Sequence, residues 1–133
     1  WAFLNSDTLK CSPDIASLVI SKNLETISGS AFKDNQISSL VFNGLDDNTG
    51  KLKEIWGSAF ENNQISELYF PKTVTTLGKD SFYGNPIQVL TIEECNTTIC
   101  SSTFSGNDYF GSQIKTLTIE SGEIGKNAFS TYV

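Results

Sequence analysis

Apolar and polar positions alternate along this chain in a segment that recurs five times. Its consensus is Ile-x-x-Leu-x-(Ile/Phe), and the five copies are Ile15/Leu18/Ile20, Ile37/Leu40/Phe42, Ile65/Leu68/Phe70, Ile87/Leu90/Ile92 and Ile114/Leu117/Ile119. At the end of each copy, two core-type apolar residues flank one residue of variable type, as Leu68 and Phe70 flank Tyr69. This alternation, rich in β-branched and aromatic residues, predicts a short half-buried β-strand in each copy.

A second element follows each predicted strand: an aliphatic residue and then, four and five positions later, a small residue and Phe. The pairs are Ala31-Phe32, Ala59-Phe60, Ser81-Phe82, Thr103-Phe104 and Ala128-Phe129, with Ala2-Phe3 as the tail of a further unit. The steps from Phe60 to Phe82 and from Phe82 to Phe104 are both 22 residues, which sets the basic unit. Longer steps come from insertions at Leu4–Asp14, Asn43–Gly50 and Ser105–Gln113.

A 22-residue unit cannot bury its own apolar face, so about five units are predicted to stack on one another. We expect a β-rich solenoid with short parallel strands on its concave face, and turns and short helical segments elsewhere. Its inward ladder is Leu40, Leu68, Leu90 and Leu117. The Phe of each pair fills the core from the opposite wall. Asparagine recurs three residues after the Phe, at Asn35, Asn63, Asn85 and Asn107, and is interpreted as a structural ladder that bonds the loop backbone.

These positions resemble the BspA-type (Treponema-type) leucine-rich repeat, whose unit reads roughly Leu-x-x-(Ile/Val)-x-(Ile/Leu)-Pro, an aliphatic residue, Ile-Gly and Ala-Phe. The best match runs from Ile65 to Phe82 and carries Pro71, Val74 and Leu77-Gly78 at corresponding places. The chain departs from the pattern in its insertions, its single Pro after a strand, and Asn where many members have Cys. The resemblance implies a surface-exposed or secreted protein of bacteria or parasitic protists that acts in adhesion and protein binding.

Period-two alternation also predicts which side chains face outward. The outward sets are Ser17/Val19/Ser21, Ser39/Val41/Asn43, Glu67/Tyr69/Pro71, Val89/Thr91/Glu93 and Thr116/Thr118/Glu120. From these we take Val41, Glu67, Tyr69, Thr91 and Glu93 as candidate binding residues, with Tyr69 as a central anchor. The alternative is that Tyr69 packs across strands beside Val41 and Thr91, and that the glutamates only keep the face solvated.

Two insertions are predicted to lie on opposite rims of the sheet. The Ser105–Gln113 segment contains Tyr109 and Phe110, an adjacent aromatic pair that is a further candidate contact site unless one ring covers the core. The Asn43–Gly50 segment contains Asp46-Asp47-Asn48 but lacks the spaced acids and terminal Glu of a calcium loop, so no metal site is expected.

Composition excludes several function classes. The 133 residues include no His, which removes Ser-His-Asp, Cys-His and HExxH chemistry. No phosphate-binding Gly motif or CxxC pair is present, so neither an enzyme nor a cofactor is expected. Nine Lys plus Arg against 15 Asp plus Glu give a net charge of −6, which does not favour nucleic acid. Apolar runs are too short for membrane insertion.

The three cysteines leave alternatives open. Cys95 and Cys100 flank a turn in which Asn96 replaces an inward aliphatic residue, and a short disulfide there would restrain the turn. Otherwise all three thiols stay reduced, or Cys11 pairs outside this segment. Asn96-Thr97-Thr98 is also a glycosylation sequon if the source is eukaryotic and secretory.

Taken together, residues 1–133 are interpreted as one leucine-rich-repeat domain, a fragment of a longer protein at the cell surface or secreted. Its expected function is non-enzymatic protein binding or adhesion, with a macromolecule held by the concave sheet or an inserted rim loop. The alternative is a structural spacer or self-assembling shaft that presents another domain. No polar capping helix follows Phe129, so end-to-end self-association is a further expectation.

Overall fold

The computed structural model describes residues 15–45, 47–95 and 114–123, and within these ranges the chain forms strands and turns. The strands are β1 (Ser17–Ile20), β2 (Thr26–Ile27), β3 (Ser39–Phe42), β4 (Glu54–Ile55), β5 (Glu67–Phe70), β6 (Thr76–Leu77), β7 (Val89–Cys95) and β8 (Thr116–Gly122). They match the predicted strand of each repeat, with an additional two-residue strand after β1, β3 and β5.

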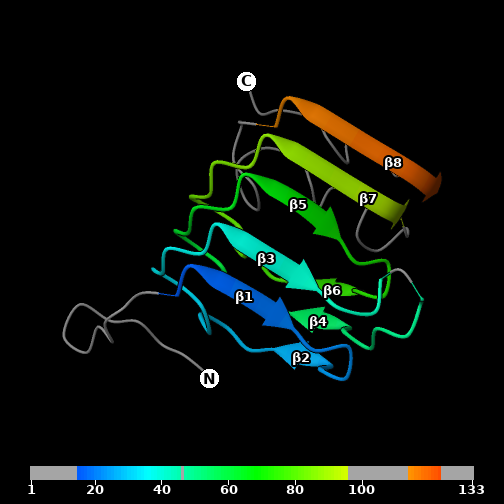
Figure 1. The fold of residues 1–133 in the computed structure, drawn as a ribbon, viewed down its shortest axis with the longest axis horizontal. Coiled ribbons are helices and arrows are strands. Elements are labelled where there is room, and N and C mark those ends of the chain that lie inside the picture. The colour runs from blue at the N-terminus through cyan, green and yellow to red at the C-terminus, as the bar shows by residue number, and fades with distance from the viewer. Residues whose placement is uncertain (1–14, 46, 96–113, 124–133) are drawn as a thin grey trace.

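Every strand pair in the described residues is parallel, as the repeat pattern predicts. The longer strands form the sheets β1-β3 and β5-β7-β8, and the two-residue strands form a third sheet, β2-β4-β6. Figure 1 shows the longer strands running in one direction along one wall, with the short strands along a second. The register aligns equivalent repeat positions: Leu18 is opposite Leu40, and Leu68 is opposite Leu90.

Side chains on these strands alternate between core and solvent. Leu68 and Phe70 are buried, whereas Tyr69 between them is exposed. Leu117 is opposite the buried Leu90 and faces the same side of the sheet, but it is 38% exposed, since β8 has a neighbouring strand on one side only within the described residues. One predicted orientation is wrong. Pro71, predicted outward, is buried because β5 ends at Phe70 and the backbone enters a turn in which Val74 N–H donates to the Pro71 carbonyl.

The rings of Phe32, Phe60 and Phe82 stack in a row behind the strands. Their centroids are 5.4 Å apart for Phe32 and Phe60, and 5.1 Å apart for Phe60 and Phe82. The small residue before each Phe is also buried, which lets successive turns approach closely. This confirms the predicted core role of these three rings. Phe104 and Phe129 lie outside the described residues.

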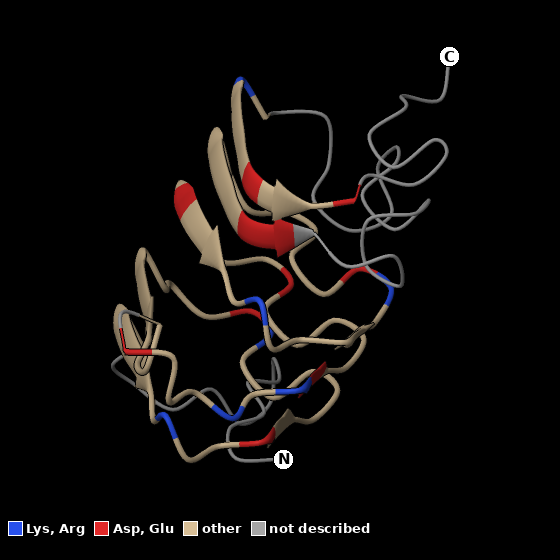
Figure 2. Ribbon diagram, turned by 90° about the vertical axis from the view of Figure 1, so that its right-hand side faces the viewer, with Lys and Arg blue, Asp and Glu red and all other residues tan. Residues whose placement is uncertain are grey.

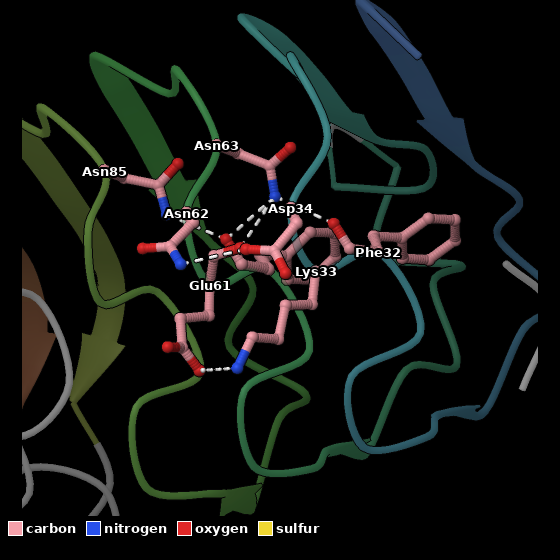
Figure 3. Close-up of polar contacts among 8 residues, drawn as sticks. Phe32, Lys33, Asp34, Glu61, Asn62, Asn63 and Asn85 are labelled. Carbon is pink, nitrogen blue, oxygen red and sulfur yellow. Dashed lines mark hydrogen bonds and ion pairs between the residues drawn. The ribbon is translucent and has the colours of Figure 1, made fainter. Parts of the chain in front are cut away.

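A buried asparagine row runs beside the rings, as predicted. The Asn63 amide Nδ2 donates to the carbonyls of Phe32 (2.8 Å) and Phe60 (2.9 Å), while Oδ1 accepts from Ile37 N–H (3.1 Å). Asn85 repeats the arrangement one unit further on, with Phe60, Phe82 and Ile65 as its partners. Each side chain therefore ties its own unit to the preceding one (Figure 3).

Turns replace the short helical segments that the sequence analysis expects, at least in the described residues. Ser30, Asp34, Ser58, Asn62 and Asp80 all have φ between 57° and 60°. This left-handed conformation is incompatible with a continuing right-handed helix. Asn62 Nδ2 donates to Asp34 Oδ1 (2.9 Å), and Lys33 pairs with Glu61 (3.2 Å), so side chains also connect these turns between units (Figure 3).

Gly78 lies where two turns meet, and replacing it with alanine should destabilise the fold. A Cβ there would overlap the backbone N of Gly57 and lie 2.5 Å from the Trp56 carbonyl carbon. Because backbone cannot rotate away as a side chain can, we expect a loss of about 1–3 kcal/mol in the free energy of unfolding, measured by urea denaturation. Gly57→Ala is the matched control, since its Cβ would lie 3.2 Å from the Lys79 carbonyl oxygen and 4.0 Å from the Lys79 N, without overlap. Equal losses for the two variants would contradict this reading.

Candidate functional site

The outward face of the longer strands carries a row of side chains at equivalent repeat positions, three of them apolar or aromatic. Val19 is opposite Val41, and Tyr69 is opposite Thr91, which is in turn opposite Thr118. Val19, Val41 and Tyr69 are 57%, 46% and 41% exposed. We call these five residues the outward row. Its members come from the middle of short strands, where period-two alternation turns each away from the core.

Tyr69 is the largest side chain of the outward row, and its position is set by a contact across the sheet. Its hydroxyl donates to Glu120 Oε2 (3.4 Å), although β7 lies between the two strands that carry them. The ring therefore extends over the Thr91 position toward β8. This arrangement leaves the exposed ring with a preferred orientation.

The predicted acidic residues occupy different environments. Glu67 is exposed at the start of β5, whereas Glu93 on β7 is half-buried and pairs with Lys72 (3.5 Å). Figure 2 shows acidic segments on β5, β7 and β8. Glu67 and Glu120 thus give the outward face a negative rim, while Glu93 is partly neutralised. Among the candidate residues, Val41, Tyr69 and Glu67 are accessible and Thr91 is half-buried.

Residues 43–45 and 47–50, which follow β3, fold back on themselves. Thr49 and Gly50 N–H both donate to the Gly44 carbonyl (3.0 and 3.1 Å), and Gly44 has φ of +88°. Hydrogen bonds from the Thr49 hydroxyl and backbone N–H hold the pKa of the Asp47 carboxyl below its usual value. The Asp47 carboxylate is therefore charged at neutral pH.

The sheet is interrupted between β3 and β5, a feature that the sequence analysis missed. These strands belong to different sheets, although they are the consecutive long strands of adjacent units. Two cavities lie along the interruption, of about 370 Å³ and about 250 Å³. We call the space between β3 and β5 the seam. One feature of the sequence coincides with the seam: Pro71, directly after β5, has no backbone N–H.

Several predicted features lie outside the described residues: Tyr109, Phe110, the Asn96 sequon, Asn107, Cys11 and Cys100. The alternatives for the disulfide involve Cys11 and Cys100, so they lie outside the described residues as well. Asp46 is likewise undescribed. In the part of the chain that the structure describes, no three His, Cys, Asp or Glu residues gather as metal ligands do. The same part contains no helix with the length and apolar character of a membrane span.

Comparison with known proteins identifies the family. Residues 44–132, more than half of the chain, match the family model described as BspA type Leucine rich repeat region (6 copies). No curated protein and no solved structure matches the chain. The matched residues include the loop beside the seam, the candidate residues on β5 and β7, and the central Phe60 and Asn63. The chain belongs to the BspA-type leucine-rich repeat family.

Proposed function

We propose that this chain is a non-enzymatic protein-binding module, in which the units of residues 1–133 stack as one solenoid domain and bind a macromolecule through the outward row. Membership of a leucine-rich repeat family supports an interaction role. The observation that carries the proposal is the exposure of Val19, Val41 and Tyr69 at equivalent positions of three strands. Large apolar side chains gathered on one face are typical of interaction surfaces.

Tyr69 is proposed as the anchor of this surface. Tyrosine brings a large apolar ring with a polar tip, and it is enriched among residues whose truncation strongly weakens binding. The hydrogen bond to Glu120 restricts the ring before a partner arrives. Less conformational freedom is then lost on binding, so more of the contact energy contributes to affinity. Val41 and Thr91 would flank the ring in the interface, with Glu67 and Glu93 at its edge.

The proposed setting is the cell surface or the extracellular medium, where the module acts in adhesion. BspA-type repeats are typically found in such proteins, and this supports the assignment. The rim insertion with Tyr109 and Phe110 is kept as a second contact region of the same module. A rigid spacer that presents another domain would need none of these exposed side chains, and the test below separates the two functions.

Replacing Tyr69 with alanine should weaken binding without unfolding the domain. We would measure binding to immobilised purified extracellular-matrix proteins by surface plasmon resonance. For any protein that the wild type binds, we expect Tyr69→Ala to lower affinity by roughly thirtyfold or more, the effect of losing about 2 kcal/mol at a binding hot spot. Tyr83→Ala is the matched control, because Tyr83 is equally exposed (43%) but lies in a turn away from the strands.

Equal affinities for Tyr69→Ala and Tyr83→Ala would contradict binding through the outward row. If the wild type bound no protein on the panel, the spacer function would be favoured. Circular dichroism of both variants checks that the fold is retained.

A further inference from the structure

The seam is an opening confined to the strands. On one side of it, Gln64 N–H donates to the Ile37 carbonyl (2.8 Å), and on the other, Thr75 N–H donates to the Lys53 carbonyl (2.9 Å). The second wall is continuous, since β4 pairs with both β2 and β6. Adjacent units are therefore bonded before and after the strands, while β3 and β5 form no shared sheet.

Backbone polar groups of β3 point into the seam. Ser39 and Asn43 N–H donate to carbonyls of the β1 segment, at Ala16 (3.3 Å) and Ile20 (2.9 Å). Because successive residues of a strand direct their N–H and C=O to opposite sides, those of Leu40 and Phe42 face β5. Such an edge is a template for pairing with another extended chain.

The facing side of β5 is short of one donor. Val89 N–H donates to the Ser66 carbonyl (3.3 Å), so alternation directs the backbone of Glu67 toward β3. Pro71 follows β5 directly and has no N–H, whereas its equivalent Asn43 donates to the Ile20 carbonyl of the preceding unit. The bond that would tie the end of β5 to the preceding unit is therefore absent, as at an edge strand.

The two cavities along the seam provide space for a ligand and have a negatively charged lining. The smaller one is lined by Ser38, Ser39, Leu40, Ser66 and Glu67, and the larger by residues 40–45 with Asp47 and Tyr69. Leu40 borders both cavities, so the two adjoin each other. The described lining residues include the acids Asp47 and Glu67 and no Lys or Arg. An occupant with positive charge is therefore complementary.

We propose that an extended basic segment of a partner protein docks along the seam, hydrogen-bonds as an added strand to the β3 edge, and directs Lys or Arg side chains to Asp47 and Glu67. This inference rests on the proposed protein-binding function and names its ligand class. Strand addition to an exposed sheet edge is a general mode of peptide recognition, with main-chain bonds giving affinity and side chains giving specificity. Four-residue strands give a contact about 13 Å long, which fits a peptide of about four to six residues.

The test uses a synthetic probe, the peptide acetyl-Lys-Val-Lys-Thr-Lys-Val-amide, titrated into the isotope-labelled chain. We expect saturable shifts of the Leu40, Phe42 and Glu67 amide signals in NMR spectra. N-methylation of the two central peptide nitrogens keeps the charge and removes main-chain donors, and it should weaken binding by roughly tenfold or more. The double variant Asp47→Asn/Glu67→Gln should lose a similar factor, whereas Glu25→Gln, an exposed acid that lines neither cavity, should stay within about twofold.

Four results would overturn the seam proposal. Absence of saturable binding up to roughly 1 mM peptide would mean that the seam does not accept a strand. Unchanged affinity of the N-methylated peptide would reduce the interaction to charge attraction. Unchanged affinity of the double variant would place the peptide elsewhere. Dimerisation of the peptide-free chain, with the same amide shifts, would assign the seam to a second copy.

The experiments distinguish a failure of the seam proposal from a failure of the proposed binding through the outward row. If the peptide does not bind but Tyr69→Ala still weakens binding to a matrix protein, the outward row stands and the seam proposal falls. If the peptide binds at the seam and Tyr69→Ala changes no affinity, the outward-row assignment falls instead.

Discussion

Replacing Asn63 with alanine is expected to lower the free energy of unfolding by about 2–4 kcal/mol, because the change leaves a buried backbone N–H without an acceptor and opens a small void. The Asn63 side chain is fully buried. Its carbonyl is the acceptor for Ile37 N–H, which then has no replacement. The two carbonyls that Asn63 bonds are less affected, since Asn35 also donates to Phe32 (3.2 Å) and Asn85 to Phe60 (2.8 Å).

Urea denaturation followed by circular dichroism measures this loss. Gln64→Ala is the matched control: the same amide chemistry one residue on, but with an exposed side chain, so its effect should stay within about 0.5 kcal/mol. If the two variants were equally stable, the asparagine row would not bind the units together.

Replacing Phe60 with alanine is expected to cost about 3–5 kcal/mol, the range for removing a fully buried aromatic ring. Phe60 stacks between Phe32 and Phe82, and the Phe42 ring of β3 lies nearly perpendicular to it, with the two centroids 6.5 Å apart. Backbone hydrogen bonds fix the spacing between neighbouring units, so these units cannot move together to fill the void. The loss should therefore lie near the upper end of the range.

The same denaturation experiment applies, with Tyr83→Ala as the control. Tyr83 is an exposed aromatic residue in the turn that follows Phe82, and its truncation should change stability by less than about 0.5 kcal/mol. A Phe60→Ala variant that lost less than about 1 kcal/mol would contradict the central place of this ring.

Much of the fold could be predicted because the repeat carries local rules. Alternation at Leu68, Tyr69 and Phe70 predicts which side chains face the core, and the recurrence of Phe and Asn predicts the rows behind the strands. The exposure of Val41 and Tyr69 follows from the same alternation. These features depend on neighbours in sequence, or on the equivalent residue one unit away.

Other features depend on interactions that a periodic pattern does not encode. The seam arises from main-chain bonding between β3 and β5, about which side-chain alternation says nothing. The turns that stand in place of helical segments depend on a left-handed backbone conformation at Ser30 and Asp34. The residue type does not predict this conformation at either position. The contact between Tyr69 and Glu120 joins strands that are two apart in the sheet.

We infer that buried side-chain amides bind successive units into one rigid wall, from which the outward row is presented. Native-state hydrogen exchange by NMR tests it most directly at Ile37 and Ile65, whose N–H groups lie outside every strand and donate to Asn63 and Asn85. We predict that these two amides exchange as slowly as the ladder amide of Val89. Exchange as fast as that of Lys22, in an exposed turn, would contradict the claim.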